Sequence, residues 1–363
     1  MKRKNAISIA AIAVILVLTL LVNILGFGYF SNILVQVLGG FTVTNGQSAD
    51  DLDLVYHKSD YATTDDLVTA KDALGQEIAE NGIVLLKRDS QSGFPYAEGT
   101  AFSFFSQSSD NWLATGSGSG SGSSVNTNLK TVFEGAGFKV NDTLWTFYKE
   151  GNGNASRGAG PIDYGDAQDY SINEVPASKI KDESGLEATF KGTVATFIFS
   201  RLGGEGVDLP RGMNQDAATD ADRARHYLEP DSVELGVLQY LQDNPDFDEI
   251  LLIVNSSNAP ELSWTENFSK IHTILDVPCT GKTGLYAVPE ILKGSIAPSG
   301  RLATTIAADL LASPAAMNID EGLYYPEGNY PDRTEGNMNY NYVYYAENIS
   351  VSNAFCRSSA HAY

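Results

Sequence analysis

Short apolar segments alternate with amphipathic helical patterns through most of this chain of 363 residues. Buried strands are predicted at residues 83–86, 102–105, 194–199, 250–254 and 271–275. Apolar residues recur at helical spacing at residues 129–133, 232–241 and 285–292. This alternation is typical of an α/β fold, in which helices sandwich a largely parallel sheet. Ligands of such folds bind beyond the carboxyl ends of the strands, so the loops that follow strands are the places to search for a site.

The first 30 residues combine a basic start with a long apolar run. Lys2, Arg3 and Lys4 precede it, and no charged residue occurs between Ala6 and Phe27. About 20 apolar residues suffice to cross a bilayer, and basic flanks tend to stay in the cytoplasm. We therefore expect a single-pass membrane anchor over residues 1–30, with a cytoplasmic N-terminus and the main domain outside the cell. A cleaved signal peptide is the alternative, although its apolar region usually spans only about 7–15 residues.

Four regions are predicted along the chain. Residues 1–30 form the cytoplasmic start and the transmembrane helix, 31–63 a tether, 64–345 the α/β domain and 346–363 an aberrant tail. The folded pattern begins at Thr64, where a capped helix would carry Leu67, Ala70, Leu74 and Ile78 on one face and end at Gly82.

Composition excludes several classes of function. The formal net charge is −21, from 45 acidic and 24 basic side chains, so binding to nucleic acid is not expected. The two cysteines and four histidines lie far apart and match no metal-binding motif, so no metal or other cofactor is expected. Residues 115–124 are rich in glycine and serine but do not fit a dinucleotide or nucleophile-elbow motif. Residues 281–283 lack the earlier glycine of a phosphate-binding loop.

One strand runs directly into a loop that can carry chemistry. Residues 200–210, SRLGGEGVDLP, place Glu205 between glycines at the carboxyl end of the predicted strand 194–199. Glycines let the backbone turn sharply and let a ligand approach closely. A carboxyl group that is partly removed from water there can become a proton donor. The alternative is that Glu205 is a solvated loop charge.

This loop resembles the acid/base loop of glycoside hydrolase family 3, the β-glucosidase-type enzymes. Other stretches are similar to that family in the same order: residues 77–86, 115–125, 255–258 and 294–302. Several ordered motifs are more specific than any one of them. The resemblance implies the family's α/β sandwich domain, usually called its C-terminal domain and here placed N-terminally. It also implies a carbohydrate substrate, Glu205 as the acid/base and Asp208 as a substrate-binding or loop-supporting residue.

The family's nucleophile is an aspartate on a separate TIM-like barrel, and no motif for it is found in this sequence. We therefore expect a barrel supplied by a separate or out-of-frame segment, and little hydrolysis by the chain alone. The likeness stops after Val351, which suggests a frameshift or early stop. The alternatives are a membrane-anchored, non-catalytic carbohydrate-binding or vestigial module and, less favoured, a receptor or transporter subunit.

Overall fold

The computed structural model describes residues 2–25, 59–116, 122, 127–158, 160, 169–205, 209, 219, 222 and 225–310. The chain divides into two compact units, Met1–Ala62 and Thr63–Tyr363. In the second unit the strands are β1 (Val84–Arg88), β2 (Ala101–Phe105), β3 (Lys139–Val140), β4 (Thr193–Arg201), β5 (Ile250–Ser256) and β6 (Ile271–Asp276). Its α-helices are α3 (Thr64–Gly82), α4 (Leu129–Gly135), α5 (Asp142–Glu150), α6 (Ala177–Asp182), α8 (Ser232–Asp243) and α9 (Ala287–Lys293).

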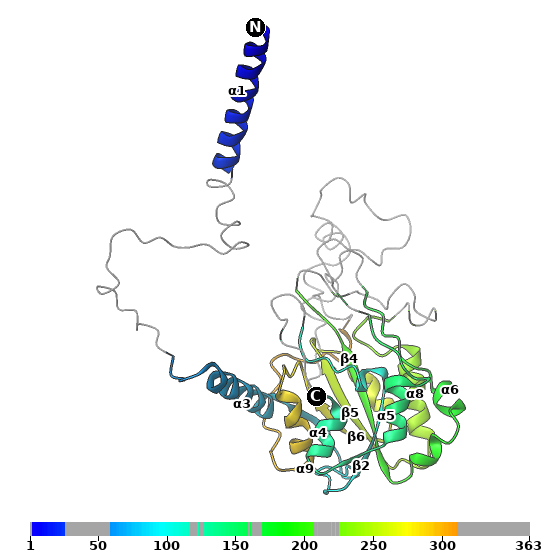
Figure 1. Cartoon of the computed structure of the whole chain (residues 1–363). Helices are drawn as coiled ribbons and strands as arrows, with labels where there is room; N and C mark the ends of the chain where they lie inside the picture. Colours follow the sequence, from blue (N-terminus) through cyan, green and yellow to red (C-terminus); the bar gives the residue numbers. More distant parts are fainter. Residues whose placement is uncertain are drawn as a thin grey trace, which may run out of the picture. The chain divides into compact units, whose positions relative to one another are not determined.

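The six strands form one sheet in the order β1-β6-β5-β4-β2-β3 (Figure 1). Every pairing is parallel except that of β1 with β6, which is antiparallel. The predicted α/β sheet is therefore present, with one antiparallel strand at its edge. Because β4 and β5 occupy the centre and are buried along most of their length, they read in the sequence as continuous apolar runs.

Helices cover both faces of the sheet. Successive side chains along each strand point to opposite faces, so each strand contributes to both layers of the core. On one face Ile250, Leu252 and Val254 pack with residues of α5, α6 and α8. On the other face Leu251 and Ile253 pack with residues of α4 and α9 and with Ala79 of α3. These two layers hold the sheet rigid, and the rigid sheet fixes where the loops after its strands begin.

The predicted transmembrane anchor over residues 1–30 is wrong. In the described part of the chain, no helix is both long enough and apolar enough to cross a membrane. Helix α1 (Lys2–Ile24) does form, and its first three residues are the charged Lys2, Arg3 and Lys4. The location in the cell membrane that followed from the anchor falls with it.

The predicted domain boundaries at residues 30, 63 and 345 stay predictions. The tail at 346–363 lies outside the described residues, as does nearly all of the tether.

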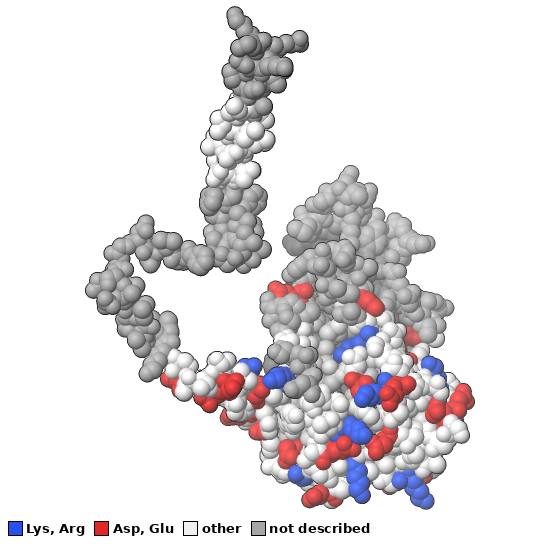
Figure 2. Space-filling view, in the orientation of Figure 1, with Lys and Arg blue, Asp and Glu red and all other residues white. Residues whose placement is uncertain are grey.

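On the visible surface of the folded unit, basic and acidic side chains are interspersed (Figure 2). Lys130, for example, pairs with Asp142 and with Glu134. Exposed pairs of this kind contribute little to stability.

Candidate functional site

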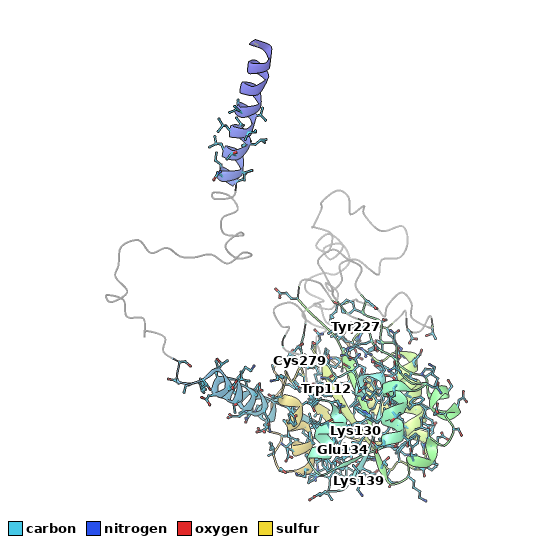
Figure 3. All side chains as sticks on the ribbon, in the orientation of Figure 1. Trp112, Lys130, Glu134, Lys139, Tyr227 and Cys279 are labelled. Carbon is cyan, nitrogen blue, oxygen red and sulfur yellow. The ribbon has the colours of Figure 1, made fainter. Side chains whose placement is uncertain are left out.

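The carboxyl ends of β2, β4, β5 and β6 meet at one edge of the sheet, because these strands run parallel. This edge is called the carboxyl edge below. Figure 3 shows Tyr227 and Cys279 toward this end of the folded unit and Lys139, at the start of β3, toward the other end. In α/β folds of this kind, ligands bind beyond such an edge.

A buried ion pair fixes the end of β4. Arg201, the last residue of the strand, is 0% exposed. Its Nη1 and Nη2 donate to the two carboxylate oxygens of Glu234 on α8, at 2.9 and 2.6 Å. Its Nε donates to the backbone oxygen of Tyr227 at 2.6 Å. Burial alone would lower the pKa of Arg201, but the Glu234 carboxylate raises it, so the guanidinium stays charged. Bidentate pairs of this type are strong and directional.

The start of α8 places Glu234 where it can pair with Arg201. Asp231 caps this helix, and the backbone N–H of Glu234 donates to its side chain at 2.7 Å. The Glu234 carboxylate in turn accepts from the backbone N–H of Asp231 at 2.9 Å. This capping box orients Glu234 toward Arg201. Burial raises the pKa of Asp231 to about 7, with a further contribution from the nearby Glu234 carboxylate.

The residues after Arg201 are tightly held before the chain reaches Glu205. The backbone N–H of Leu202 donates to the hydroxyl of Tyr227 at 3.0 Å. A Cβ on Gly203 would lie 2.3 Å from Nδ2 of Asn258, so a larger residue there would require the Asn258 side chain to move. Glu205 then lies on a turn and is exposed. The predicted substrate-binding residue Asp208 lies outside the described residues.

Asn255, near the end of β5, ties two loops of the carboxyl edge to that strand. Its Oδ1 accepts from the backbone N–H of Leu113 at 2.8 Å, in the loop after β2. Its Nδ2 donates to the backbone oxygens of Leu113 at 2.9 Å and of Val277, after β6, at 3.1 Å. The side chain is 0% exposed. The motif at residues 255–258 thus supports the loops around the edge.

A strained residue follows β2, and a buried acid from a later part of the chain lies beside it. Ser106 has a φ of 93°, which is unusual for a residue with a side chain. Beside it, Oε1 of Glu174 accepts from the backbone N–H groups of Gln107 at 3.1 Å and Val175 at 2.8 Å. Glu174 Oε2 is buried and has no hydrogen-bond partner in the part of the chain that the structure describes. Burial raises the pKa of Glu174 to about 7, although these hydrogen bonds act against the rise. Sequence reasoning missed this acid, since only the fold brings it to Ser106.

The stretch at residues 294–302 has a structural role. Gly294 ends α9 with a φ of 81°, in the left-handed region that suits glycine. The backbone N–H of Gly300 donates to the backbone oxygen of Ile83 at 3.2 Å. A Cβ on Gly300 would lie 2.4 Å from that oxygen, so the close backbone approach requires glycine. This motif therefore joins the segment after α9 to the residue that precedes β1.

Comparison with known proteins connects this edge to an enzyme family. No family model matches the chain. A β-glucosidase of Ruminococcus albus is 27% identical to it over 187 residues, and β-glucosidase A of Butyrivibrio fibrisolvens is 24% identical over 280 residues. The chain shares its fold with β-glucosidase 3B of Thermotoga neapolitana, solved in complex with α-D-glucose. That likeness has a TM-score of 0.52 at 19% identity and covers 70% of this chain and 33% of that chain. This chain is related to the family 3 β-glucosidases.

The relationship confirms the resemblance predicted from the ordered motifs. The sequence matches cover 51% and 72% of this chain, but only 17% and 31% of the two β-glucosidases. The chain thus matches less than a third of each family 3 relative, as expected for a single domain of that family. Neither the sequence matches nor the shared fold tests the roles predicted for Glu205 and Asp208.

Proposed function

We propose that this chain is the acid/base-bearing α/β domain of a family 3 glycoside hydrolase that cleaves β-linked glucosides or related sugars with retention of configuration. The observation that carries the proposal is the support of the Glu205 loop. The Arg201–Glu234 pair and the Tyr227 hydroxyl fix the backbone just before Glu205, at the carboxyl edge. A loop that only connects two elements does not need such support.

In the proposed mechanism Glu205 acts twice. It first protonates the glycosidic oxygen as the bond to the leaving group breaks, and the sugar is transferred to a carboxylate nucleophile. It then accepts a proton from water, which attacks the glycosyl-enzyme intermediate and releases the sugar. Asp208 is proposed to contact the substrate or to support the loop.

The nucleophile is proposed to come from a barrel domain on another segment or chain. A retaining enzyme needs its second carboxylate about 5–5.5 Å from the first. The relatives contain much sequence outside the matched segments, which cover 17% and 31% of their lengths. The exposure of Glu205 supports this idea, since a general acid works best when partly removed from water. A barrel placed over the carboxyl edge would provide that environment.

The test compares leaving groups. Protein isolated from its natural host, so that any partner is retained, is assayed with dinitrophenyl β-glucoside and with methyl β-glucoside. We expect Glu205→Gln to slow cleavage of the methyl glucoside by about 10²–10⁴-fold. Dinitrophenolate departs without protonation, so formation of the intermediate from that substrate should be affected much less. Glu134→Gln, an exposed substitution on α4, is the control. Unchanged turnover of the methyl glucoside by Glu205→Gln would refute the assignment.

A second candidate is a domain that binds carbohydrate without cleaving it. The missing motif for the family's nucleophile favours it, because a retaining glycosidase needs a second carboxylate. Calorimetry of the whole chain with gluco-oligosaccharides tests this candidate. Heat of binding with no product release, even in the presence of host extract, would favour the binding role over the enzymatic one.

A further inference from the structure

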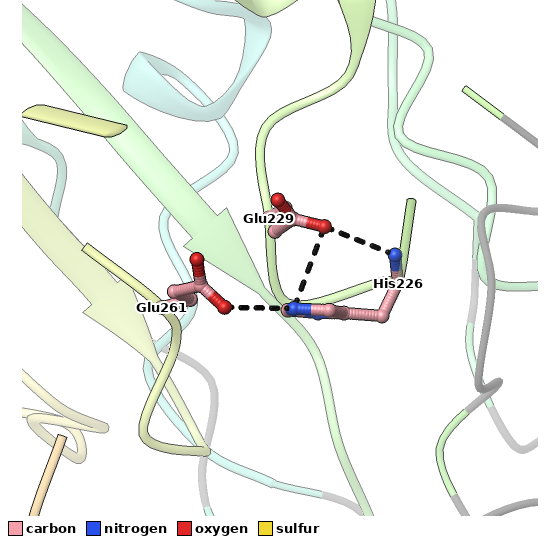
Figure 4. Close-up of side chains that lie close together, drawn as sticks. All are labelled: His226, Glu229 and Glu261. Carbon is pink, nitrogen blue, oxygen red and sulfur yellow. Dashed lines mark hydrogen bonds and ion pairs between the residues drawn. The ribbon is translucent and has the colours of Figure 1, made fainter. Parts of the chain in front are cut away.

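A second polar cluster is built from one histidine and two glutamates, His226, Glu229 and Glu261 (Figure 4). His226 Nε2 lies 3.1 Å from Glu261 Oε2 and 3.4 Å from Glu229 Oε2. One nitrogen or oxygen atom from each residue lies within 4.8 Å of the other two. His226 is 4% exposed and Glu261 is 8% exposed, so the cluster is largely removed from bulk water.

Further hydrogen bonds hold the carboxylates of the cluster in place. Glu261 Oε1 accepts from the hydroxyl of Ser263 at 2.7 Å, and Glu261 Oε2 accepts from the backbone N–H of Leu310 at 2.8 Å. Glu229 Oε2 accepts from the backbone N–H of His226 at 3.2 Å. Carboxylates that bind metal ions are fixed by supporting hydrogen bonds of this kind. The three donor groups are therefore oriented before any ligand arrives.

The cluster has more negative charge than its nearest cation can balance. A neutral imidazole offers one N–H at Nε2, yet two carboxylate oxygens converge on that atom. Arg225 reaches only the outer oxygen of Glu229, at 3.9 Å, and is itself partly exposed. Buried like charges this close are unfavourable unless a cation lies between them.

The ring of His226 presents its other nitrogen to the cluster. Its Nδ1 is buried and has no hydrogen-bond partner among the described residues. The ring is therefore oriented by what its Nε2 meets, and Nε2 faces the two glutamates (Figure 4). A metal ion on Nε2 would supply the missing cation.

We propose that His226, Glu229 and Glu261 bind one divalent transition-metal ion of the zinc type. One imidazole nitrogen and two carboxylate oxygens form a donor set that zinc accepts, whereas magnesium and calcium sites in proteins are built from oxygen. Three protein donors leave a coordination position for water.

The site connects the parts that support the Glu205 loop. Residues 226–229 supply the Tyr227 contacts to Arg201 and Leu202. The backbone N–H of Glu261, in the loop after β5, donates to the backbone oxygen of Leu228 at 3.2 Å. A bound ion would brace these two segments against each other. The site does not depend on a catalytic role for Glu205, so the two proposals can fail separately.

The test is a metal titration of the full chain after treatment with a chelator. Zinc is titrated in competition with a chromophoric zinc indicator, and magnesium is titrated in parallel by calorimetry. We expect one zinc ion per chain and no comparable uptake of magnesium. Glu261→Gln and Glu229→Gln should each weaken zinc binding at least about tenfold.

Glu134→Gln, which makes the same chemical change on the exposed surface of α4, should bind zinc as the unaltered chain does. Circular dichroism checks that each variant folds. If Glu261→Gln fails to fold, Glu229→Gln, whose side chain is 20% exposed, still decides the question. Absence of stoichiometric zinc uptake, or equal affinity in the folded cluster variants, would overturn the proposal.

Discussion

At the scale of single residues, the structure depends on a few buried charges whose partners lie far away in sequence. Arg201 occurs in the stretch that resembles family 3, but its partner Glu234 is 33 positions further along. The capping pattern of Asp231 and Glu234 could have been read from the sequence, whereas its pairing with Arg201 depends on where α8 packs. Glu205 could be singled out because its glycine-flanked loop is local.

Breaking the buried pair should destabilise the fold strongly. Glu234→Gln leaves Arg201 charged and poorly paired inside the protein, so we expect the free energy of unfolding to fall by about 3–5 kcal/mol. Urea denaturation measures the change. Glu134→Gln is the matched control, because it breaks the exposed pair with Lys130 and should cost no more than about 0.5 kcal/mol. Similar losses in the two variants would contradict the role given to the buried pair.

Glu174 should make stability depend on pH. Its pKa is raised from 4.5 to about 7 in the folded protein, so the folded state holds a proton that the unfolded chain releases. The contribution is full below pH 4.5 and is lost as the pH rises toward and past 7. The expected loss is about 3 kcal/mol.

Urea denaturation at several pH values tests this dependence. Glu174→Gln imitates the protonated side chain and should flatten the stability profile between pH 5 and 7, while Glu134→Gln should leave the slope unchanged. An equally steep profile in Glu174→Gln would show that other groups, such as Asp231 or Asp276, produce the dependence.

At the scale of elements, the apolar runs predicted five of the six strands to within a few residues. The missed strand, β3, has two residues and is too short to produce a pattern.

Helix α3 forms where predicted and is capped by Thr63. The face read as apolar, however, stays outside, with Leu74 55% exposed and Ile78 62% exposed. Gly75 and Ala79 pack against residues 280–284 instead, because small residues let the backbones approach closely.

Two helical glycines give a matched test of that close packing. A Cβ on Gly75 would lie 2.8 Å from Oγ1 of Thr283, which donates to the backbone oxygen of Asp72. A Cβ on Gly236 in α8 would meet nothing within 4 Å. We expect Gly236→Ala to raise the free energy of unfolding by about 0.5–1 kcal/mol and Gly75→Ala to give no gain or a loss. Thermal denaturation compares the two, and an equal gain in both would mean that α3 does not pack as described.

At the scale of the whole molecule, the sheet gathers several strand-following loops at one edge, and this much follows from the sequence, since parallel strands end together. The membrane anchor predicted from the sequence is wrong, since in the described part of the chain no helix is both long enough and apolar enough to cross a membrane. The contact between His226 and Glu261, which is 35 positions further along, could not be predicted from the sequence. It depends on how the loops after β4 and β5 pack.

The central claim is that this chain contributes one carboxylate of a two-carboxylate glycosidase site. A fluorinated glucosyl fluoride that forms a slowly hydrolysed glycosyl-enzyme tests it directly. Protein isolated from its natural host is treated with this reagent, digested and mapped by mass spectrometry. We expect the sugar to attach to an aspartate of a barrel segment outside residues 1–363. We also expect the Glu205→Gln variant to be labelled more slowly than the unaltered protein when the reagent carries a poor leaving group. Attachment of the sugar to Glu205 or to any other carboxylate of this chain would contradict the account.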